Sequence, residues 1–334
     1  EFWGYSVFNQ YAVTSQTYKI DMKQKVITVI GGTGFLGRYI VKSLAAAGYT
    51  IRVISRHPEN ALHLKTAGDV GQVVLMGANL SNPDSLFGKL DGSYAVINLV
   101  GVLYEGGRQR FGTLHAEGAE KLAKMAKTVG AERFIQISAL AVDKTKLAGE
   151  KAVLTAFPEA TILRPSIVFG PEDNFYNQFA RIAAFAPALP LIGGGNTRFQ
   201  PVYVMDVARA ILACLEKPET RGQTFELAGP QTYSFKQILQ YILKLTDKKR
   251  CLVKLPFGIA SFIATFTQLL PVPPLTRDQV RLLKCDNVAA ANAQGFAQLG
   301  ITPTAVEMIV PEYLARYRSR QNNQGNNASS TVPA

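Results

Sequence analysis

The first clear hydrophobic pattern in the chain is a short apolar run, Val26–Ile30, followed by clustered glycines and then by apolar residues spaced three and four apart. A short continuous run is typical of a strand buried in a parallel sheet, whereas the wider spacing is typical of a helix that packs on that sheet. The sequence therefore predicts a strand, a turn and a helix. The apolar face of this helix would contain Phe35, Leu36, Ile40, Val41 and Leu44.

The same alternation continues as far as residue 163. Strands separated by helices form βαβ units, and repeated units build a parallel sheet. We therefore expect an α/β fold of the Rossmann type, a doubly wound parallel sheet of six or more strands with a smaller C-terminal lobe. The further strands are expected at 50–55, 70–76, 94–100, 133–138 and 160–163, and the further helices at 60–66, 83–90, 111–129 and 145–157.

Beyond residue 169 the pattern loosens into helices interrupted by proline and glycine, which is typical of a lobe at the carboxyl edge of such a sheet. The polar, low-complexity end of the chain predicts a disordered tail. The expected organisation is an aromatic N-terminal arm at 1–23, an NAD(P)-binding Rossmann domain at 24–170, a smaller mostly helical lobe at 171–318, which can include strands that return to the sheet, and the tail at 319–334.

Three glycines of the first turn, Gly31, Gly34 and Gly37, stand three residues apart between the first strand and its helix. In a dinucleotide-binding turn the first glycine allows the tight turn, the second lets backbone N–H groups approach a pyrophosphate, and the third lets the helix pack close to the strand. The flanking strand and helix are the context that this motif requires. The alternative is a glycine-rich surface turn without a ligand.

The second strand ends at Ser55, and Arg56 follows where an NAD-specific site has a carboxylate for the ribose 2′-hydroxyl. A guanidinium can instead pair with the 2′-phosphate of NADP, and Arg38 could add a second contact. The alternative is that both arginines are merely solvated. The expected cofactor is NADPH.

Composition narrows the choice of partners only slightly. The chain has 334 residues with 36 basic and 24 acidic side chains, a net charge of +12, which favours an acidic partner surface. Its three cysteines and three histidines are not spaced like metal ligands, so no metal site is expected. The longest uncharged apolar stretch, 257–270, is too short to span a bilayer and would be a buried helix or a helix at a membrane or subunit surface.

Four sequence motifs together carry a family resemblance. They are GGTGFLG at 31–37, SALAV at 138–142, LRPSIVFGPEDNF at 163–175 and GGGNTRFQPVYVMDVA at 193–208. With these motifs the chain, from about residue 24 to residue 318, resembles the atypical extended short-chain dehydrogenase/reductase family. It is most similar to the branch that forms the nucleotide-binding accessory subunit of respiratory complex I, NADH:ubiquinone oxidoreductase.

Active members of this superfamily use a serine at the end of the fifth strand and, on the next helix, a tyrosine and a lysine four residues apart. Ser138 matches the serine and Lys146 matches the lysine, but Val142 occupies the tyrosine position. Valine can neither donate nor accept a proton, so the resemblance implies a degenerate site with no catalytic residue.

The resemblance and the turn chemistry together imply one set of cofactor-binding residues. They are Gly31, Thr33, Gly34, Phe35, Leu36, Gly37, Arg38, Ser55, Arg56, Ala78, Asn79, Leu80, Leu99, Val100, Gly101, Ser138, Lys146, Pro165 and Ser166.

Two main interpretations follow from the sequence. The first is a non-catalytic NADPH-binding accessory subunit of complex I, located at the membrane-proximal part of its peripheral arm. It would lie on the matrix side of the mitochondrial inner membrane or, alternatively, on the cytoplasmic face of a bacterial inner membrane. Its partners would be other complex I subunits and, through 257–270, lipid. The second is a free NADPH-dependent reductase or epimerase with an atypical active site. A nucleotide-sensing regulator is a third, and a nucleic-acid partner is not expected, because the basic residues are scattered.

Overall fold

The computed structural model describes residues 25–80, 82–100, 111–140, 144–267, 280–281 and 283–318. The arm expected at 1–23 and the tail expected at 319–334 lie outside this part of the chain. By its contacts the chain forms two compact units, each assembled from separate segments. The first unit runs to Arg164 and adds Met205–Glu226 and Gln294–Ile301; the second contains Pro165–Val204, Leu227–Ala293 and the chain from Thr302 onward.

The first unit is built on a seven-stranded sheet with the strand order β11-β6-β5-β4-β1-β2-β3. All neighbouring pairs from β3 to β6 are parallel. The strand order reverses between β1 and β4, which makes the sheet doubly wound and confirms the predicted fold class. The strands are β1 (Val26–Ile30), β2 (Thr50–Ser55), β3 (Val73–Gly77), β4 (Ser93–Asn98), β5 (Arg133–Ile137), β6 (Thr161–Pro165) and β11 (Thr224–Leu227).

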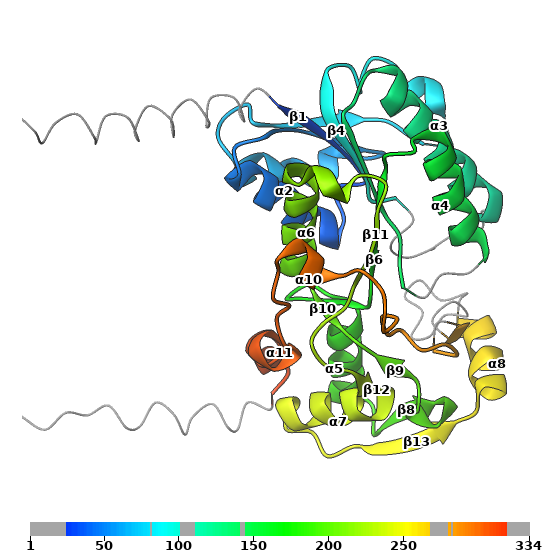
Figure 1. Ribbon diagram of the computed structural model, residues 1–334. Coiled ribbons are helices and arrows are strands. Elements are labelled where there is room, and N and C mark those ends of the chain that lie inside the picture. The colour runs from blue at the N-terminus through cyan, green and yellow to red at the C-terminus, as the bar shows by residue number, and fades with distance from the viewer. Residues whose placement is uncertain are drawn as a thin grey trace, which may run out of the picture. The chain divides into compact units, whose positions relative to one another are not determined.

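Helices cover both faces of this sheet. Figure 1 shows α3 and α4 on one side of β1 and β4, and α2 on the other. The predicted apolar face of α2 is buried at Leu36, Ile40, Val41 and Leu44. The main helices of the unit are α2 (Phe35–Ala46), α3 (Phe111–Thr128), α4 (Lys144–Ala156) and α6 (Val204–Glu216), with the short α10 (Phe296–Leu299) and η4 (Pro218–Thr220).

Two predicted helices of the first unit are only 3-10 segments. The segment η1 (Pro58–Ala67) buries just Ala61 and Leu64, so it lacks the apolar stripe that would hold an α-helix on the sheet. The segment η2 (Pro83–Leu86) is four residues long, and Gly88 beyond it has a φ of +71°. The backbone leaves the helical region at Phe87, where ψ is +133°, and turns left-handed at Gly88, so no helix continues to residue 90.

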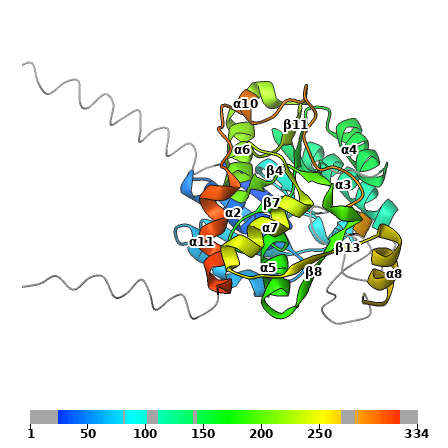
Figure 2. The ribbon, with the colours of Figure 1, turned by 90° about the horizontal axis from the view of Figure 1, so that it is seen from below.

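The second unit combines short strand pairs with packed helices. Figure 2 shows α11 alongside α5 and α7, with which it is in contact. The strands pair as β10 with β7, β12 with β9, and β13 with β8. The elements are β7 (Val168–Phe169), α5 (Phe175–Phe185), β8 (Ala188–Ile192), η3 (Gly193–Gly195), β9 (Arg198–Phe199), β10 (Val202–Tyr203), β12 (Tyr233–Ser234), α7 (Phe235–Thr246), β13 (Cys251–Leu255), α8 (Phe257–Thr267), α11 (Val306–Leu314) and η5 (Ala315–Tyr317).

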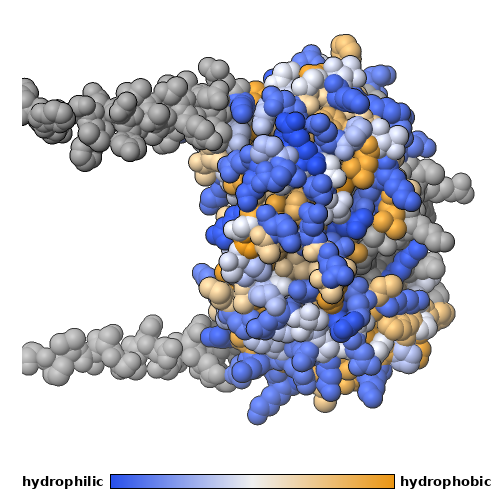
Figure 3. Space-filling model, viewed as in Figure 1, coloured by the Kyte–Doolittle hydropathy of each residue, from blue (hydrophilic) through white to orange (hydrophobic). Residues whose placement is uncertain are grey.

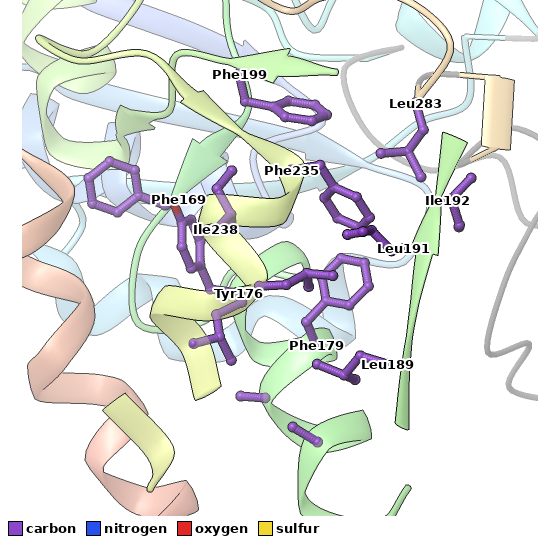
Figure 4. Packing of buried hydrophobic residues seen from close by; sticks show 14 of the residues in the cluster. Phe169, Tyr176, Phe179, Leu189, Leu191, Ile192, Phe199, Phe235, Ile238 and Leu283 are labelled. Carbon is purple, nitrogen blue, oxygen red and sulfur yellow. The ribbon is translucent and has the colours of Figure 1, made fainter. Parts of the chain in front are cut away.

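Aromatic rings form the centre of this unit (Figure 4). The ring of Phe179 lies edge-on to Phe235 with centroids 5.2 Å apart, and Phe175 lies edge-on to Phe179 at 5.3 Å. Edge-to-face pairs of this kind add stability beyond the area that they bury. The core therefore joins α5 to α7, and the buried ring of Phe199 on β9 packs against Phe235 with centroids 6.3 Å apart.

The GPEDNF part of the third motif has a structural role in the same unit. Asp173 is buried and accepts hydrogen bonds from the backbone N–H groups of Tyr176 (2.7 Å) and Asn177 (3.2 Å), so it caps the start of α5. The hydroxyl of Tyr313 on α11 donates to the same carboxylate at 2.5 Å. Burial raises the pKa of Asp173, and these hydrogen bonds oppose that rise. The motif thus ties α11 to α5.

Candidate nucleotide-binding site

The glycine turn lies where a doubly wound sheet binds nucleotides, at the carboxyl end of β1 beside β4. Gly31 has a φ of +77°, and its N–H group donates to the carbonyl of Ile54 at 2.9 Å. A Cβ atom at Gly31 would lie 3.1 Å from Cγ2 of Val100. A left-handed backbone and a close neighbour both explain why glycine occupies this position.

The other two glycines of the motif have opposite surroundings. A Cβ atom at Gly37 would lie 2.4 Å from the carbonyl oxygen of Gly32, so the helix packs directly on the turn. Among the described residues, a Cβ atom at Gly34 would meet only the carbonyl oxygen of Gly31, at 3.9 Å, and Gly34 is exposed. The space over Gly34 is open at the N-terminus of α2, where backbone N–H groups favour a phosphate.

Two buried polar atoms beside the turn fit a bound nucleotide. Nε of Arg38 and Oγ of Ser55 are buried, and within the described part of the chain neither has a hydrogen-bond partner. Buried polar groups are nearly always paired, so an unpaired donor and hydroxyl here suit a ligand with phosphate and ribose oxygens. Arg56, by contrast, is exposed at the end of β2.

The loop after β3 is held in place beside β2. The N–H group of Ala78 donates to the carbonyl of Ser55 at 2.9 Å, and the ammonium of Lys89 donates to the carbonyl of Gly77 at 2.8 Å. The hydroxyl of Ser85 accepts from the N–H group of Asn79 at 2.9 Å. This loop, which carries the expected cofactor-binding residues Ala78, Asn79 and Leu80, is therefore fixed next to the strand that carries Ser55.

Hydrogen bonds also fix the loop after β4. The side-chain amide of Asn98 donates to Oε1 of Gln136 at 2.9 Å, and its oxygen accepts from the N–H group of Val100 at 3.1 Å. The structure thus brings most of the expected nucleotide residues to one edge of one sheet, while Gly101 lies outside the described residues. They are Gly31, Thr33, Gly34, Phe35, Leu36, Gly37 and Arg38 after β1, Ser55 and Arg56 after β2, Ala78, Asn79 and Leu80 after β3, and Leu99 and Val100 after β4.

The other expected cofactor-binding residues divide between the two units. Ser138 follows β5 and is buried, with its N–H group 2.7 Å from the carbonyl of Leu163, and Lys146 lies in the first turn of α4. Pro165 and Ser166 belong to the second unit, where the Ser166 hydroxyl donates to Oδ1 of Asn287 at 2.6 Å. Val142 lies outside the described residues. The roles given to these residues remain predictions.

One charged group near the site was not anticipated from the sequence. The guanidinium of Arg164 on β6 binds the carboxylate of Glu150 on α4, with Nη2 2.6 Å from Oε2, and lies 3.5 Å from the carboxylate of Glu226 on β11. The available signals were the position of Glu150 four residues after Lys146 and that of Arg164 directly before Pro165. Without knowledge of the strand order, neither position indicates that Arg164 and Glu150 form an ion pair.

Two kinds of feature are absent from the described residues. None of their helices is both long and apolar enough to cross a membrane. These residues also contain no group of three or more His, Cys, Asp or Glu side chains that could hold a metal ion.

The sheet order and the glycine turn define this chain as a protein with an NAD(P)-binding domain of the doubly wound class. A family model described as NAD(P)H-binding matches residues 31–165, and one described as RmlD substrate binding domain matches residues 141–294. A solved structure of dTDP-glucose 4,6-dehydratase from Streptomyces venezuelae, with NAD and TYD bound, has the same fold. Its TM-score is 0.68 at 15% identity, with 90% of this chain and 98% of that chain covered.

The chain belongs to the family of NADH dehydrogenase (ubiquinone) 1 alpha subcomplex subunit 9, which confirms the resemblance found in the sequence. It is 38% identical to the mitochondrial protein of that name from Arabidopsis thaliana, with 92% of this chain and 82% of the relative covered. It is 35% identical to the mitochondrial NADH-ubiquinone oxidoreductase 40 kDa subunit of Neurospora crassa, with 87% and 79% covered.

Proposed function

We propose that this chain is a non-catalytic accessory subunit of respiratory complex I that holds NADPH as a structural part of its peripheral arm. The observation that carries the proposal is a nucleotide turn with open space over Gly34 in a chain that lacks the active-site tyrosine. Its relatives are named as subunits of NADH dehydrogenase. The open nucleotide turn, the missing tyrosine and the names of the relatives all favour a subunit that binds a nucleotide without catalysing a reaction.

A tightly bound nucleotide would stabilise the folded subunit. A ligand that binds only the folded state contributes about 2.7 kcal/mol at a hundredfold excess over its dissociation constant. The phosphates would lie on the turn at 31–37, which joins β1 to α2, and the ribose would lie near Ser55. NADPH would therefore hold together the edge of the sheet where four strands end.

We place the docked subunit on the matrix side of the mitochondrial inner membrane, in contact with other complex I subunits and with lipid. The lipid contact would involve α8, on which Ile259 and Phe262 are 53% and 66% exposed. Figure 3, drawn in the view of Figure 1, shows apolar side chains at the surface on the side where α8 lies. The ammonium of Lys284 lies 5.9 Å from the centre of the Phe257 ring. Apolar side chains beside a cation suit an anionic membrane surface, and sedimentation with anionic vesicles tests this contact.

The test of the proposed function is to isolate the chain from its native source and measure its size and bound nucleotide. We expect it to comigrate with a large membrane complex and to carry NADPH in about a 1:1 ratio, as a single nucleotide site requires. A chain that runs alone and free of nucleotide would contradict the proposal.

A free NADPH-dependent reductase or epimerase is the second candidate, because Ser138 and Lys146 are retained and residues 141–294 match a substrate-binding family model. The purified chain would then reduce ketones or act on sugar nucleotides at rates of ordinary enzymes, about 1 to 1,000 per second. We expect turnover far below that range, because the valine at position 142 cannot transfer a proton. Turnover within the range would favour the enzyme.

Changing Arg56→Asp is expected to reverse the preference for NADPH over NADH. A charge-assisted hydrogen bond to the 2′-phosphate is worth about 1.5–3 kcal/mol, so NADPH affinity should fall roughly 10- to 100-fold. Arg38→Met should weaken NADPH binding as well, because its buried Nε atom would no longer meet the ligand. Titration of both nucleotides by fluorescence measures these changes.

The matched control is Lys65→Asp, which makes the same change of charge at an exposed position in η1. It should alter both affinities only slightly. If Arg56→Asp behaves like Lys65→Asp, Arg56 does not read the 2′-phosphate.

A further inference from the structure

The short helix η2 stands beside the loop that follows β3, and one of its side chains binds the backbone of that loop. The hydroxyl of Ser85 accepts a hydrogen bond from the N–H group of Asn79 at 2.9 Å. The same hydroxyl lies 3.0 Å from the carbonyl oxygen of Asn79 and 2.6 Å from that of Asn82. A hydroxyl can donate one proton while it accepts another, so Ser85 can bind the N–H group and a carbonyl at the same time.

Contacts with the core and with β3 hold η2 in place. Leu86, the neighbour of Ser85, is 2% exposed and packs in the same core cluster as Ile54 of β2. The ammonium of Lys89 donates to the carbonyl of Gly77 at 2.8 Å and to that of Ser85 at 2.5 Å. The hydroxyl of Ser85 is therefore a fixed point against which the loop is held.

The loop at 78–80 is thus held from two sides. On the side of β2, the N–H group of Ala78 donates to the carbonyl of Ser55 at 2.9 Å. On the side of η2, Ser85 binds the backbone of Asn79. Residues 78–80 belong to no helix or strand, so these contacts supply the support that regular structure would otherwise give. A loop that is fixed before a ligand arrives loses less conformational entropy on binding, which favours affinity.

The strand order indicates which part of a dinucleotide would reach this loop. The strands β1, β2 and β3 are successive neighbours in the sheet. In a doubly wound sheet the pyrophosphate lies on the turn after the first strand, and the ribose contacts a residue at the end of the second. The adenine follows the ribose in the ligand, so it is expected over the end of β3.

We propose that Ser85 is a positioning residue for the adenine of bound NADPH, because its hydroxyl holds the backbone of Asn79 where the loop meets the base. The proposal rests on the proposed function, since it takes NADPH as the ligand. It gives a residue of η2 a role in nucleotide affinity that acts through the backbone of the preceding loop.

The first test is titration of variants of the full chain with NADPH. Ser85→Ala should lower the affinity about three- to tenfold, the range that corresponds to one backbone hydrogen bond. Ser85→Thr keeps the hydroxyl and should bind NADPH nearly as well as wild type. The matched control is Ser43→Ala, which removes a hydroxyl from another half-buried serine, in the third turn of α2, and should leave the affinity unchanged.

Fragments of the ligand separate positioning from a general loss of structure. Ser85→Ala should weaken binding of 2′,5′-ADP, which contains the adenine, by the same factor as NADPH. Binding of reduced nicotinamide mononucleotide should not change. If Ser85→Ala weakens both fragments equally, Ser85 acts on the whole fold, and the proposal is wrong. A folded Ser85→Ala chain with wild-type affinity for NADPH would overturn the proposal while leaving the proposed function intact.

A second measurement needs no nucleotide. Hydrogen exchange at the Asn79 amide should become several-fold faster in Ser85→Ala, whereas exchange at the Ala78 amide, which binds the Ser55 carbonyl, should keep its rate. Unchanged exchange at Asn79 would contradict the inference itself. A wild-type chain that binds no NADPH would refute the proposed function and the adenine role together, and faster exchange at Asn79 would then show that Ser85 fixes the loop for another purpose.

Discussion

Changing Gly37→Ala is expected to destabilise the first unit by about 3 kcal/mol, at the upper end of the usual cost of overpacking. The added Cβ atom would lie 2.4 Å from the oxygen, 2.5 Å from the carbonyl carbon and 2.6 Å from the Cα atom of Gly32. All three are backbone atoms, so no flexible side chain can move aside. Since domains are stable by only about 5–15 kcal/mol, this loss is a large share of the total.

Denaturant unfolding of the nucleotide-free chain measures this effect. Gly118→Ala is the matched control, because Gly118 lies within α3 and a Cβ atom there meets none of the described residues within 4 Å. Alanine is favoured over glycine within a helix by roughly 0.5–1 kcal/mol, so the control should be neutral or stabilised. If Gly37→Ala unfolds at the same denaturant concentration as wild type, the close packing of α2 on the turn is not what requires glycine.

The β1-turn-α2 segment was predictable because its signals are local. The apolar run, the glycines and the apolar stripe of α2 each specify structure within a few residues, and β1 (Val26–Ile30) has the predicted bounds. The sequence also predicted that the loops after these strands share one edge of the sheet, because the carboxyl ends of parallel strands lie together. The residues after β1 to β4 could therefore be placed at one edge of the sheet from the sequence.

The remaining features depend on contacts between distant parts of the chain. Glu226 meets Arg164 only because β11 returns to the edge of the sheet beside β6. The strands β7, β9, β10 and β12 have two residues each, which is too short for a period-two pattern to be recognised. The hydrogen bond from Tyr313 to Asp173 joins positions 140 residues apart. No local spacing in the sequence indicates such a contact.

Changing Gly34→Val should have the largest effect on function, and it should act through the ligand instead of the fold. The backbone at Gly34 has φ −76° and ψ −178°, an extended conformation that any residue can adopt. Within the part of the chain that the structure describes, a Cβ atom there has no neighbour closer than 3.9 Å. Valine would therefore fit the protein, at a cost of about 1 kcal/mol for a poorer helix cap, while its methyl groups fill the space over the first turn of α2.

We expect the purified Gly34→Val subunit to carry no NADPH and to melt at the temperature of nucleotide-free wild type, less the small capping loss. The yield of complex I that retains the subunit should fall, because the stabilisation by bound nucleotide, about 2.7 kcal/mol at a hundredfold excess, is lost. Gly34→Ala adds only one methyl group, so its nucleotide content and complex yield should lie between those of wild type and Gly34→Val. Bound nucleotide, melting temperature and complex yield are compared across the three chains. A Gly34→Val subunit that lacks nucleotide yet is retained at wild-type yield would show that NADPH is not a structural part of the assembly.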